Sequence, residues 1–190
     1  MTVQPADDAK VQDVASTYEA HLDDVRAAPA DEGIVELIVR RPAEGERELL
    51  DEAPVDEDLG LVGDRWATRD VARTPAYLSA QLTLISTRVL AIIEPDEERW
   101  ALAGDQLYVD FDLSEANLPA GSRLAVGTAI LEVSETPHTG CAKFSARFGS
   151  DALRWINSPV GRAHRMRGIN ARVVRGGVIH RGDRIRKADV

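Results

Sequence analysis

The chain contains a single cysteine, Cys141, and titratable or cationic residues stand close to it in the sequence. His138 lies three residues before it, Lys143 two residues after it and Arg147 six residues after it. A thiolate is the form of cysteine that acts as a nucleophile and binds metals, and nearby cations favour it. A lone cysteine makes no internal disulfide. Cys141 is therefore either a reactive or metal-binding thiol or a small buried hydrophobic side chain.

The residues around Cys141 limit the chemistry. A structural zinc site needs four ligands, and His164 and His180 lie far from Cys141 in the sequence. Another possibility stays open, namely that the thiolate completes the coordination of a softer metal. A Cys–His pair is also the minimum for an activated thiol, so Cys141, His138 and Lys143 are the candidate catalytic residues. Lys143 is the only lysine near this segment, but nothing else in the sequence indicates pyridoxal phosphate.

Charge is distributed unevenly along a chain whose net charge is −9. Residues 1–60 hold 17 acidic and 5 basic residues, whereas residues 137–190 hold 3 acidic and 12 basic residues. Only three of the 23 basic residues are lysines, and the arginine fork suits phosphate or carboxylate groups. The alternative is that these arginines are solvated surface residues. Nucleic acid is not expected, because the chain is acidic overall and shows no binding motif.

The bulk properties predict one globular domain. At 190 residues and 44% hydrophobic content, the chain is able to bury a core. No apolar run approaches the roughly 18 residues that cross a bilayer. The acidic N-terminus lacks the features of a signal peptide, so we expect a cytoplasmic protein with no membrane contact.

Periodicity separates the N-terminus from the rest of the chain. Apolar residues at helical spacing predict an acidic amphipathic helix over residues 6–28, closed by Pro29 and packed on the main body as an extension. From Gly33 the pattern alternates, and a half-buried strand is predicted up to Pro42, with Ile38 on its polar side. Residues 43–58 are expected to form a surface loop or an irregular strand.

Many short strands with regular turns follow, which predicts a mainly β fold built on a barrel with short helical insertions. A helix is predicted from Ser86 to Ile93, and helix starts are predicted at Ser150 and at Ser158. Gly176-Gly177 predicts a hairpin turn. The further strands are expected at residues 81–85, 104–110, 123–126, 128–133, 169–173, 178–179 and around Ile185.

The order of several short motifs resembles the MOSC domain, the module similar to the C-terminal part of molybdenum cofactor sulfurases. The resemblance covers residues 33–187 and leaves residues 1–32 as an acidic N-terminal helical extension. The motifs are Gly60-Leu-Val-Gly-Asp-Arg65, Gln81-Leu-Thr-Leu-Ile85, Gly104-Asp-Gln-Leu107, Leu118-Pro-Ala-Gly121 with Leu124-Ala-Val-Gly127, Cys141-Ala-Lys-Phe144, Arg167-Gly-Ile-Asn-Ala-Arg-Val173 and Gly182-Asp183.

The resemblance implies a β-barrel and a molybdenum cofactor, molybdopterin, as ligand. It also implies that Cys141 matches the family's characteristic cysteine, which ligates molybdenum or carries sulfur. Family members act in cofactor sulfuration or as small molybdenum enzymes that reduce N-hydroxylated compounds, so a redox partner or a cysteine desulfurase is implied as partner. The cofactor bears a phosphate and a dithiolene, and the candidate cofactor-binding residues are Arg147, Arg165, Arg167, Arg172, Asp64 and Arg65.

Two features distinguish this chain from family patterns. Gly140 precedes the cysteine where many members have proline, and Pro137 lies four residues before it. The aminotransferase-like domain of full-length cofactor sulfurases is also absent from the sequence. Three functions stay open: a molybdenum cofactor protein with Cys141 as metal ligand, a metal-free sulfur carrier with a Cys141 persulfide, and a non-enzymatic binding module with a buried structural cysteine. The oligomeric state is also open.

Overall fold

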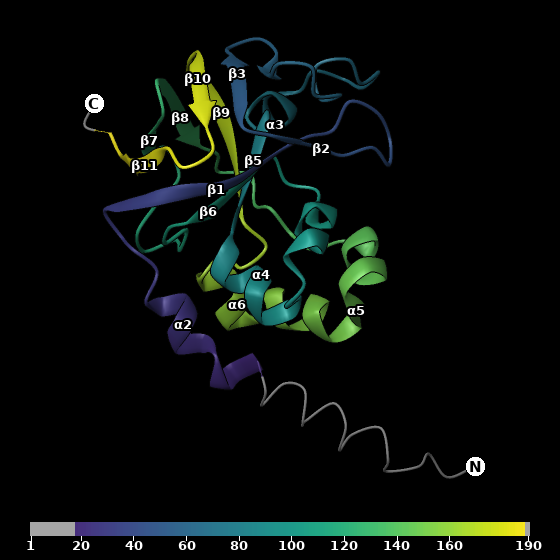
Figure 1. Cartoon of the computed structure of the whole chain (residues 1–190), viewed down its shortest axis with the longest axis vertical. Coiled ribbons are helices and arrows are strands. Elements are labelled where there is room, and N and C mark those ends of the chain that lie inside the picture. Colours follow the sequence, from purple (N-terminus) through teal and green to yellow (C-terminus); the bar gives the residue numbers. More distant parts are fainter. Residues whose placement is uncertain (1–17, 189–190) are drawn as a thin grey trace.

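The computed structural model describes residues 18–188, and Figure 1 shows a strand-rich half with most of the helices gathered at the opposite end. Seven strands close into a barrel, because β1 pairs with β11 on one side and with β6 on the other. Neighbouring strands are antiparallel except β5 and β6. The barrel order is β1 (Glu32–Arg40), β11 (Arg184–Lys187), β7 (Arg123–Val126), β8 (Ala129–Val133), β9 (Ile169–Arg175), β5 (Leu82–Ser86) and β6 (Leu107–Asp110). The expected β-barrel is confirmed.

A second, three-stranded sheet lies beside the barrel. It contains β10 (Gly177–His180), β3 (Glu52–Asp56) and β4 (Gly60–Leu61), while β2 (Glu48–Leu50) extends the main sheet beyond β1. The hairpin predicted at Gly176-Gly177 is wrong, because β10 pairs with β3 and not with β9. Neither glycine has the positive φ of a tight hairpin turn. A Cβ on Gly177 would stand 2.6 Å from Thr128 Oγ1, so this glycine allows a close strand crossing.

Most of the helices cover one end of the barrel. They are α2 (Leu22–Arg26), α4 (Thr87–Ile93), the 3₁₀ helix η1 (Glu97–Ala103), α5 (Ala142–Ile156) and α6 (Pro159–Ala163). The short helix α3 (Pro75–Leu78) lies in the strand-rich half, near β3 (Figure 1). As predicted, α4 follows Ser86, and Ser158 caps α6 by accepting a hydrogen bond from the Gly161 amide at 3.0 Å. The helix start predicted at Ser150 is the start of the second segment of α5: the helix begins at Ala142, but the backbone of Gly149 is non-helical, so a new helical segment follows it. Among residues 18–188, no helix has the length and hydrophobicity needed to cross a membrane.

The first described residues pack against the helical end. The ring of Tyr18 stacks on Trp155 of α5 with centroids 5.0 Å apart, and Val25 of α2 is buried in the same apolar cluster. Most of the helix predicted over residues 6–28, namely residues 6–17, lies outside the described residues. The division into an extension and a domain at residues 32 and 33 stays a prediction, with β1 beginning at Glu32.

Strand β1 separates two apolar cores. Ile38 belongs to the cluster that fills the barrel, and its neighbour Val39 belongs to the cluster between the barrel and the helices. The alternation predicted from the sequence placed Ile38 on the polar side, but the register shifts between Val35 and Leu37 and both Ile38 and Val39 are fully buried. Burying each such side chain contributes about 2 kcal/mol. Apolar packing therefore holds β1 on both faces up to its last residue, Arg40. Arg41, the next residue, belongs to the site described below.

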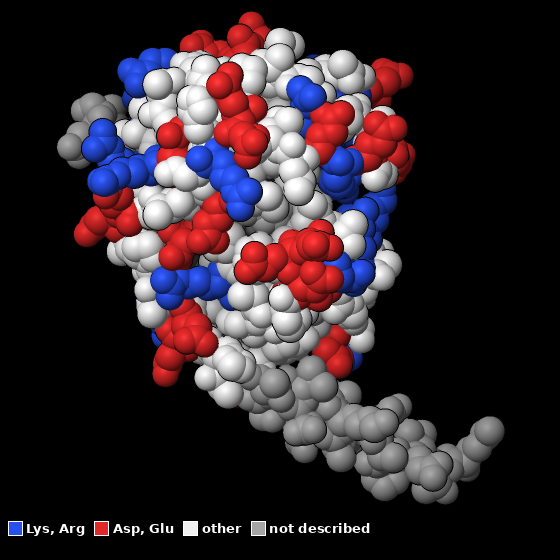
Figure 2. All heavy atoms as spheres, viewed as in Figure 1, with Lys and Arg blue, Asp and Glu red and all other residues white. Residues whose placement is uncertain are grey.

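Barrel closure also mixes the acidic and basic parts of the chain. Lys and Arg side chains are interspersed with Asp and Glu over the face shown in Figure 2. Arg184 of β11 pairs with Glu32 of β1, and Lys187 lies 3.9 Å from Asp31. The charge asymmetry of the sequence therefore becomes cross-strand ion pairing where β1 meets β11.

A substitution at Gly168 tests whether the close approach of β9 to β5 requires a glycine. Gly168 has a φ of +98°, and a Cβ there would collide with the carbonyl oxygen of Leu84. We expect Gly168→Ala to lower the free energy of unfolding by about 3 kcal/mol, from left-handed strain and displacement of a strand. Gly121→Ala is the matched control, because φ there is +85° with no atom near the new Cβ, and it should cost about 1 kcal/mol. Urea unfolding measures both, and equal losses would contradict the close-approach explanation.

Candidate functional site

Cys141 lies at the N-terminus of α5, after the loop that leaves β8. Its thiol is exposed. The preceding residue, Gly140, is wedged against the second half of α5: its amide donates to Asn157 Oδ1 at 3.2 Å, and a Cβ would meet Leu153 at 2.5 Å. A proline at this position would lose the hydrogen bond to Asn157 and would require these side chains to shift. The glycine therefore fixes the place of Cys141 by packing against the helix.

The surroundings of Cys141 lower the pKa of its thiol. The largest cause is the backbone N–H of Phe144 in the first turn of α5, and the N–H of Lys143 acts in the same direction. Partial burial opposes them, while the guanidinium groups of Arg167 and Arg147 add to the lowering. More of this thiol is therefore thiolate at neutral pH than in an ordinary cysteine.

The thiol faces a cavity of about 580 Å³, here called the thiol cavity. Its charge is strongly positive, since six arginines and one lysine line it against one glutamate. The cationic lining residues are Arg41, Arg47, Arg65, Arg69, Arg147, Arg167 and Lys143. A cavity with this lining suits an anionic ligand whose other end meets a thiolate.

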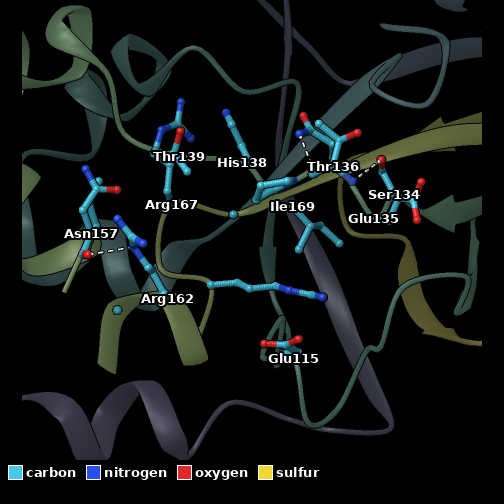
Figure 3. A pocket seen from close by; sticks show the side chains of 16 residues that line it. Glu115, Ser134, Glu135, Thr136, His138, Thr139, Asn157, Arg162, Arg167 and Ile169 are labelled. Carbon is cyan, nitrogen blue, oxygen red and sulfur yellow. Dashed lines mark hydrogen bonds between the residues drawn. The ribbon is translucent and has the colours of Figure 1, made fainter. Parts of the chain in front are cut away.

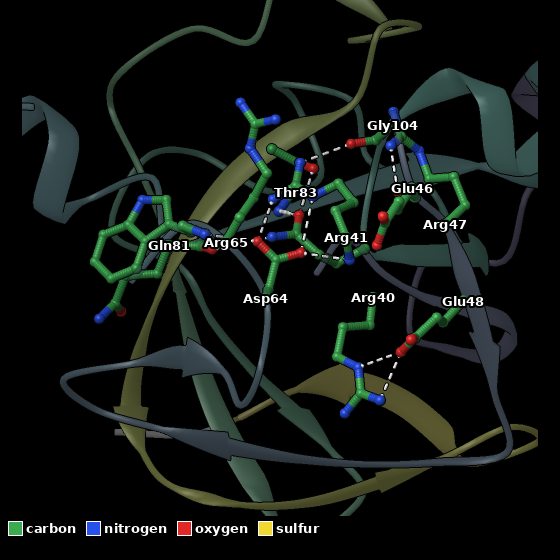
Figure 4. Close-up of polar contacts among 12 residues, drawn as sticks. Arg40, Arg41, Glu46, Arg47, Glu48, Asp64, Arg65, Gln81, Thr83 and Gly104 are labelled. Carbon is green, nitrogen blue, oxygen red and sulfur yellow. Dashed lines mark hydrogen bonds and ion pairs between the residues drawn. The ribbon is translucent and has the colours of Figure 1, made fainter. Parts of the chain in front are cut away.

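Arg41 is positioned by a buried carboxylate, as Figure 4 shows. Asp64 accepts hydrogen bonds from Arg41 Nε and Nη2, both at 2.9 Å, and from the Arg41 amide at 3.0 Å. The same carboxylate accepts from the Trp66 amide, and its side chain has no exposed surface. Asp64 therefore ties the end of β1 to the turn after β4 and directs Arg41 to the cavity.

Two further arginines approach each other across the cavity. Arg47 Nε donates to the Ala101 carbonyl at 3.2 Å, and Arg147 Nη1 donates to the Leu102 carbonyl at 2.5 Å. Burial, followed by repulsion from Arg147 and Arg41, lowers the pKa of Arg47. Crowding of like charges is relieved by a bound anion, which makes this wall a favourable place for one.

Arg167 and His138 form the inner wall. Arg167 Nη1 donates to both oxygens of Asp105, at 3.0 and 2.7 Å, whereas its buried Nε has no hydrogen-bond partner among the described residues. His138 Nδ1 lies 3.5 Å from Asp105 Oδ1. Burial and then Arg167 lower the pKa of His138 to about 4, against the attraction of Asp105. The imidazole is therefore neutral at pH 7, and it brings no positive charge to the cavity.

Lys143 lies at the mouth of the cavity. Its Nζ pairs with Glu44 at 2.7 Å, and both side chains are largely exposed. This hydrogen bond is the main cause that lowers the pKa of Glu44. Lys143 influences the thiol through its backbone N–H, and its side chain is available to an anion that displaces Glu44.

The structure brings most of the predicted site residues together. Cys141, His138, Lys143, Arg65, Arg147 and Arg167 all line the thiol cavity. The other three lie elsewhere: Asp64 is beneath Arg41, Arg165 lines a different cavity, and Arg172 donates to Glu132 on the neighbouring strand. The roles of these residues in binding stay predictions.

Sequence reasoning missed Arg41, Arg47 and Arg69, which also line the cavity. They lie between residues 41 and 69, a part of the chain whose first 20 residues were counted with the acidic N-terminal region. The available signal was Arg40-Arg41 directly after the first barrel strand, since residues at strand ends are held in place by the sheet. Counting charges over residues 1–60 as one block concealed these basic residues within an acidic region.

Comparison with solved structures supports the barrel architecture. The YuaD protein from Bacillus subtilis aligns with a TM-score of 0.60 at 19% identity, over 81% of this chain and 94% of that chain. YiiM from Escherichia coli aligns with a TM-score of 0.53 at 19% identity, over 83% of this chain and 70% of that chain. These likenesses concern the fold.

The comparison with curated proteins gives no match. A family model described as the MOSC domain matches residues 76–186, which include Cys141, Lys143, Arg147 and Arg167. Arg41, Arg47, Arg65 and Arg69 lie before the matched segment. The match spans more than half of the 190 residues, and the chain therefore belongs to the MOSC domain family.

Proposed function

We propose that this MOSC domain protein binds the molybdenum cofactor in the thiol cavity, with Cys141 as its protein ligand. The activity proposed is reduction of N-hydroxylated compounds or handling of the cofactor itself. One observation carries the proposal: an exposed thiol of lowered pKa faces a cavity lined by six arginines. A thiolate binds soft metals, and guanidinium groups bind phosphate.

The residues present fit such a group. Arg47 is crowded by Arg147 and Arg41, and Arg167 Nε is buried without a partner among residues 18–188, so a bound anion would be favourable at this wall. The volume of about 580 Å³ is within the range of small-molecule sites. Within the described residues, no cluster of three or more His, Cys, Asp or Glu side chains is placed to hold a metal. A metal carried by an organic ligand needs only one protein donor, and Cys141 provides it.

Each part of the cavity has a distinct task in this proposal. The cofactor supplies two-electron chemistry when bound. Cys141 holds the metal end as thiolate, supported by the amides of Phe144 and Lys143. Arg65, Arg69 and Lys143 near the rim suit the phosphate end, while Arg41 and Arg167 are held by Asp64 and Asp105 and define the wall. Reduction of an N-hydroxyl group to an amine and water consumes two electrons and two protons, so a redox partner is part of this proposal.

Cofactor loading tests the role of Cys141. Protein purified from a host that makes the cofactor is expected to contain molybdenum and pterin in near-equal amounts by metal analysis and by fluorescence of the oxidised pterin. Cys141→Ser should lose at least tenfold of the molybdenum, because a hydroxyl is a poor soft-metal ligand. Arg123→Gln, which alters an arginine paired with Glu132 outside the cavity, is the control and should load normally. Molybdenum retained in Cys141→Ser, or absent from the wild type, would contradict the proposal.

The pH dependence of thiol alkylation tests the electrostatics. In the cofactor-free protein, iodoacetamide should modify Cys141 with a midpoint pH below that of an ordinary thiol, because the first turn of α5 stabilises the thiolate. The thiolate persists above the lowered pKa and is lost as the pH falls through it. Arg147→Gln should move the midpoint upward, whereas Lys143→Gln should leave it in place, since Arg147 contributes through its side chain and Lys143 through its backbone N–H. The opposite ranking of these variants would show that the Lys143 side chain controls the thiol.

The exposed thiol also supports a second candidate function, a metal-free sulfur carrier. The Cys141 thiolate would attack the terminal sulfur of a persulfide on a cysteine desulfurase. A new S–S bond then forms on Cys141, and the desulfurase cysteine leaves as thiolate. Incubation with a desulfurase and cysteine should add one sulfur atom to Cys141 by mass spectrometry, and an unmodified Cys141 would exclude this function.

The third alternative, a buried structural cysteine in a binding module, is wrong in its premise, because Cys141 is exposed. Both remaining functions need a reduced thiol. We therefore propose the reducing cytoplasm as the compartment in which the protein acts.

A further inference from the structure

A second cavity of about 320 Å³ lies on the other side of His138 and Arg167, which line both cavities. Figure 3 shows it between Asn157 and Arg162 on one side and Thr136 and Glu135 on the other. Cys141 does not line it. We call it the α6 cavity, because its floor includes Gly161 and Arg162 of α6 and the segment from Arg165 to Asn170 that follows this helix.

Arg165 lines this cavity as a half-buried cation without an ion-pair partner among the described residues. It is half-buried, and it is the only non-glycine residue with positive φ in the described chain, at +45°. Its Nη1 donates to the Leu118 carbonyl at 2.5 Å, and no carboxylate among residues 18–188 lies within ion-pair distance of it. Burial lowers its pKa, and Glu115 acts on it only from a distance. A partly desolvated cation without a paired anion is costly, and a bound anion removes that cost.

Arg162 supplies a second guanidinium on the same wall. Its Nε donates to the Asn157 carbonyl at 3.0 Å, and it too has no carboxylate within ion-pair distance in the described part of the chain. The backbone strain at Arg165 and the Arg162 bond to the end of α5 thus hold two arginines beside one small cavity. Each guanidinium keeps further N–H donors beyond its one carbonyl contact, and such donors bind a planar carboxylate well.

Size and charge restrict the ligand. The cavity is near the lower limit of small-molecule sites, and Glu115 and Glu135 on its lining repel a multiply charged anion. Apolar surface comes from Pro137, Ile156 and Ile169. We propose that the α6 cavity binds a small organic monoanion, a carboxylate with a compact apolar body, through Arg165 and Arg162, at a site separate from the thiol cavity.

The site adjoins the cysteine segment. Asn157 lines the α6 cavity and accepts a hydrogen bond from the Gly140 amide, next to Cys141. His138 is part of the wall that separates the two cavities. A ligand in the α6 cavity therefore contacts residues that fix the position of the thiol, although it does not reach the thiol.

Benzoate is the probe, because it joins one carboxylate to a compact apolar ring. Titration of the ¹⁵N-labelled cofactor-free protein should shift the amides of Asn157, Gly168 and Asn170 and give one dissociation constant. Arg165→Gln and Arg162→Gln should each raise this constant at least tenfold. Arg162 is exposed, so its variant keeps the test decisive if Arg165→Gln does not fold.

Two further variants locate the binding. Arg123→Gln, outside both cavities, and Arg65→Gln, in the thiol cavity, should leave benzoate affinity within twofold of the wild type. Inorganic phosphate should bind more weakly than benzoate at the α6 amides. The proposal is overturned if benzoate does not bind, if Arg65→Gln alone abolishes binding, or if folded Arg162→Gln binds benzoate as the wild type does. Failure of cofactor loading leaves this test unaffected, because the α6 site is assayed without cofactor.

Discussion

The thiol cavity depends on one short run of backbone carbonyl groups at the end of η1. Four successive oxygens each accept a hydrogen bond from one arginine, so the guanidinium groups are held apart around one opening. The pairs are Ala101 with Arg47, Leu102 with Arg147, Ala103 with Arg167 and Gly104 with Arg41. The C-terminal end of a helix carries partial negative charge, which balances this convergence of cations. Without these acceptors the arginines would repel one another toward solvent.

The two aspartates near this run act in the same way. Asp64 and Asp105 are buried and each forms an ion pair with one arginine, Arg41 or Arg167. Neither carboxylate faces the thiol cavity as a lining residue. The Gly-Asp segments at residues 63–64 and 104–105 thus support the cationic wall from behind. The carboxylates neutralise part of its charge, while Arg47, Arg65, Arg69 and Arg147 leave the opening positive.

Local patterns predicted most of the fold and part of the site. Ser86 and Ser158 precede helices, and the alternating segments near residues 82, 107, 124 and 131 are barrel strands. The hairpin prediction at Gly176-Gly177 was wrong because β10 pairs with β3, a segment distant in the sequence. A local turn motif carries no information about such a pairing. Cys141, Lys143 and Arg147 were found because they are close in sequence. Arg41 and Arg47 were not, since they are held at the cavity by carbonyl acceptors 63 and 54 residues away in the sequence.

The pairing of β1 with β11, which closes the barrel, determines at what stage of folding the site forms. Arg184 of β11 and Glu32 of β1 pair across 152 residues, and the cavity walls come from segments spread between them. Joining ends so far apart is slow because the intervening chain must lose its freedom first. A nascent chain that already contains the cysteine but lacks β11 has an open barrel and an unsupported β1. The thiol thus acquires its cationic surroundings at the end of folding, and before that only the amides of its own helix can stabilise the thiolate.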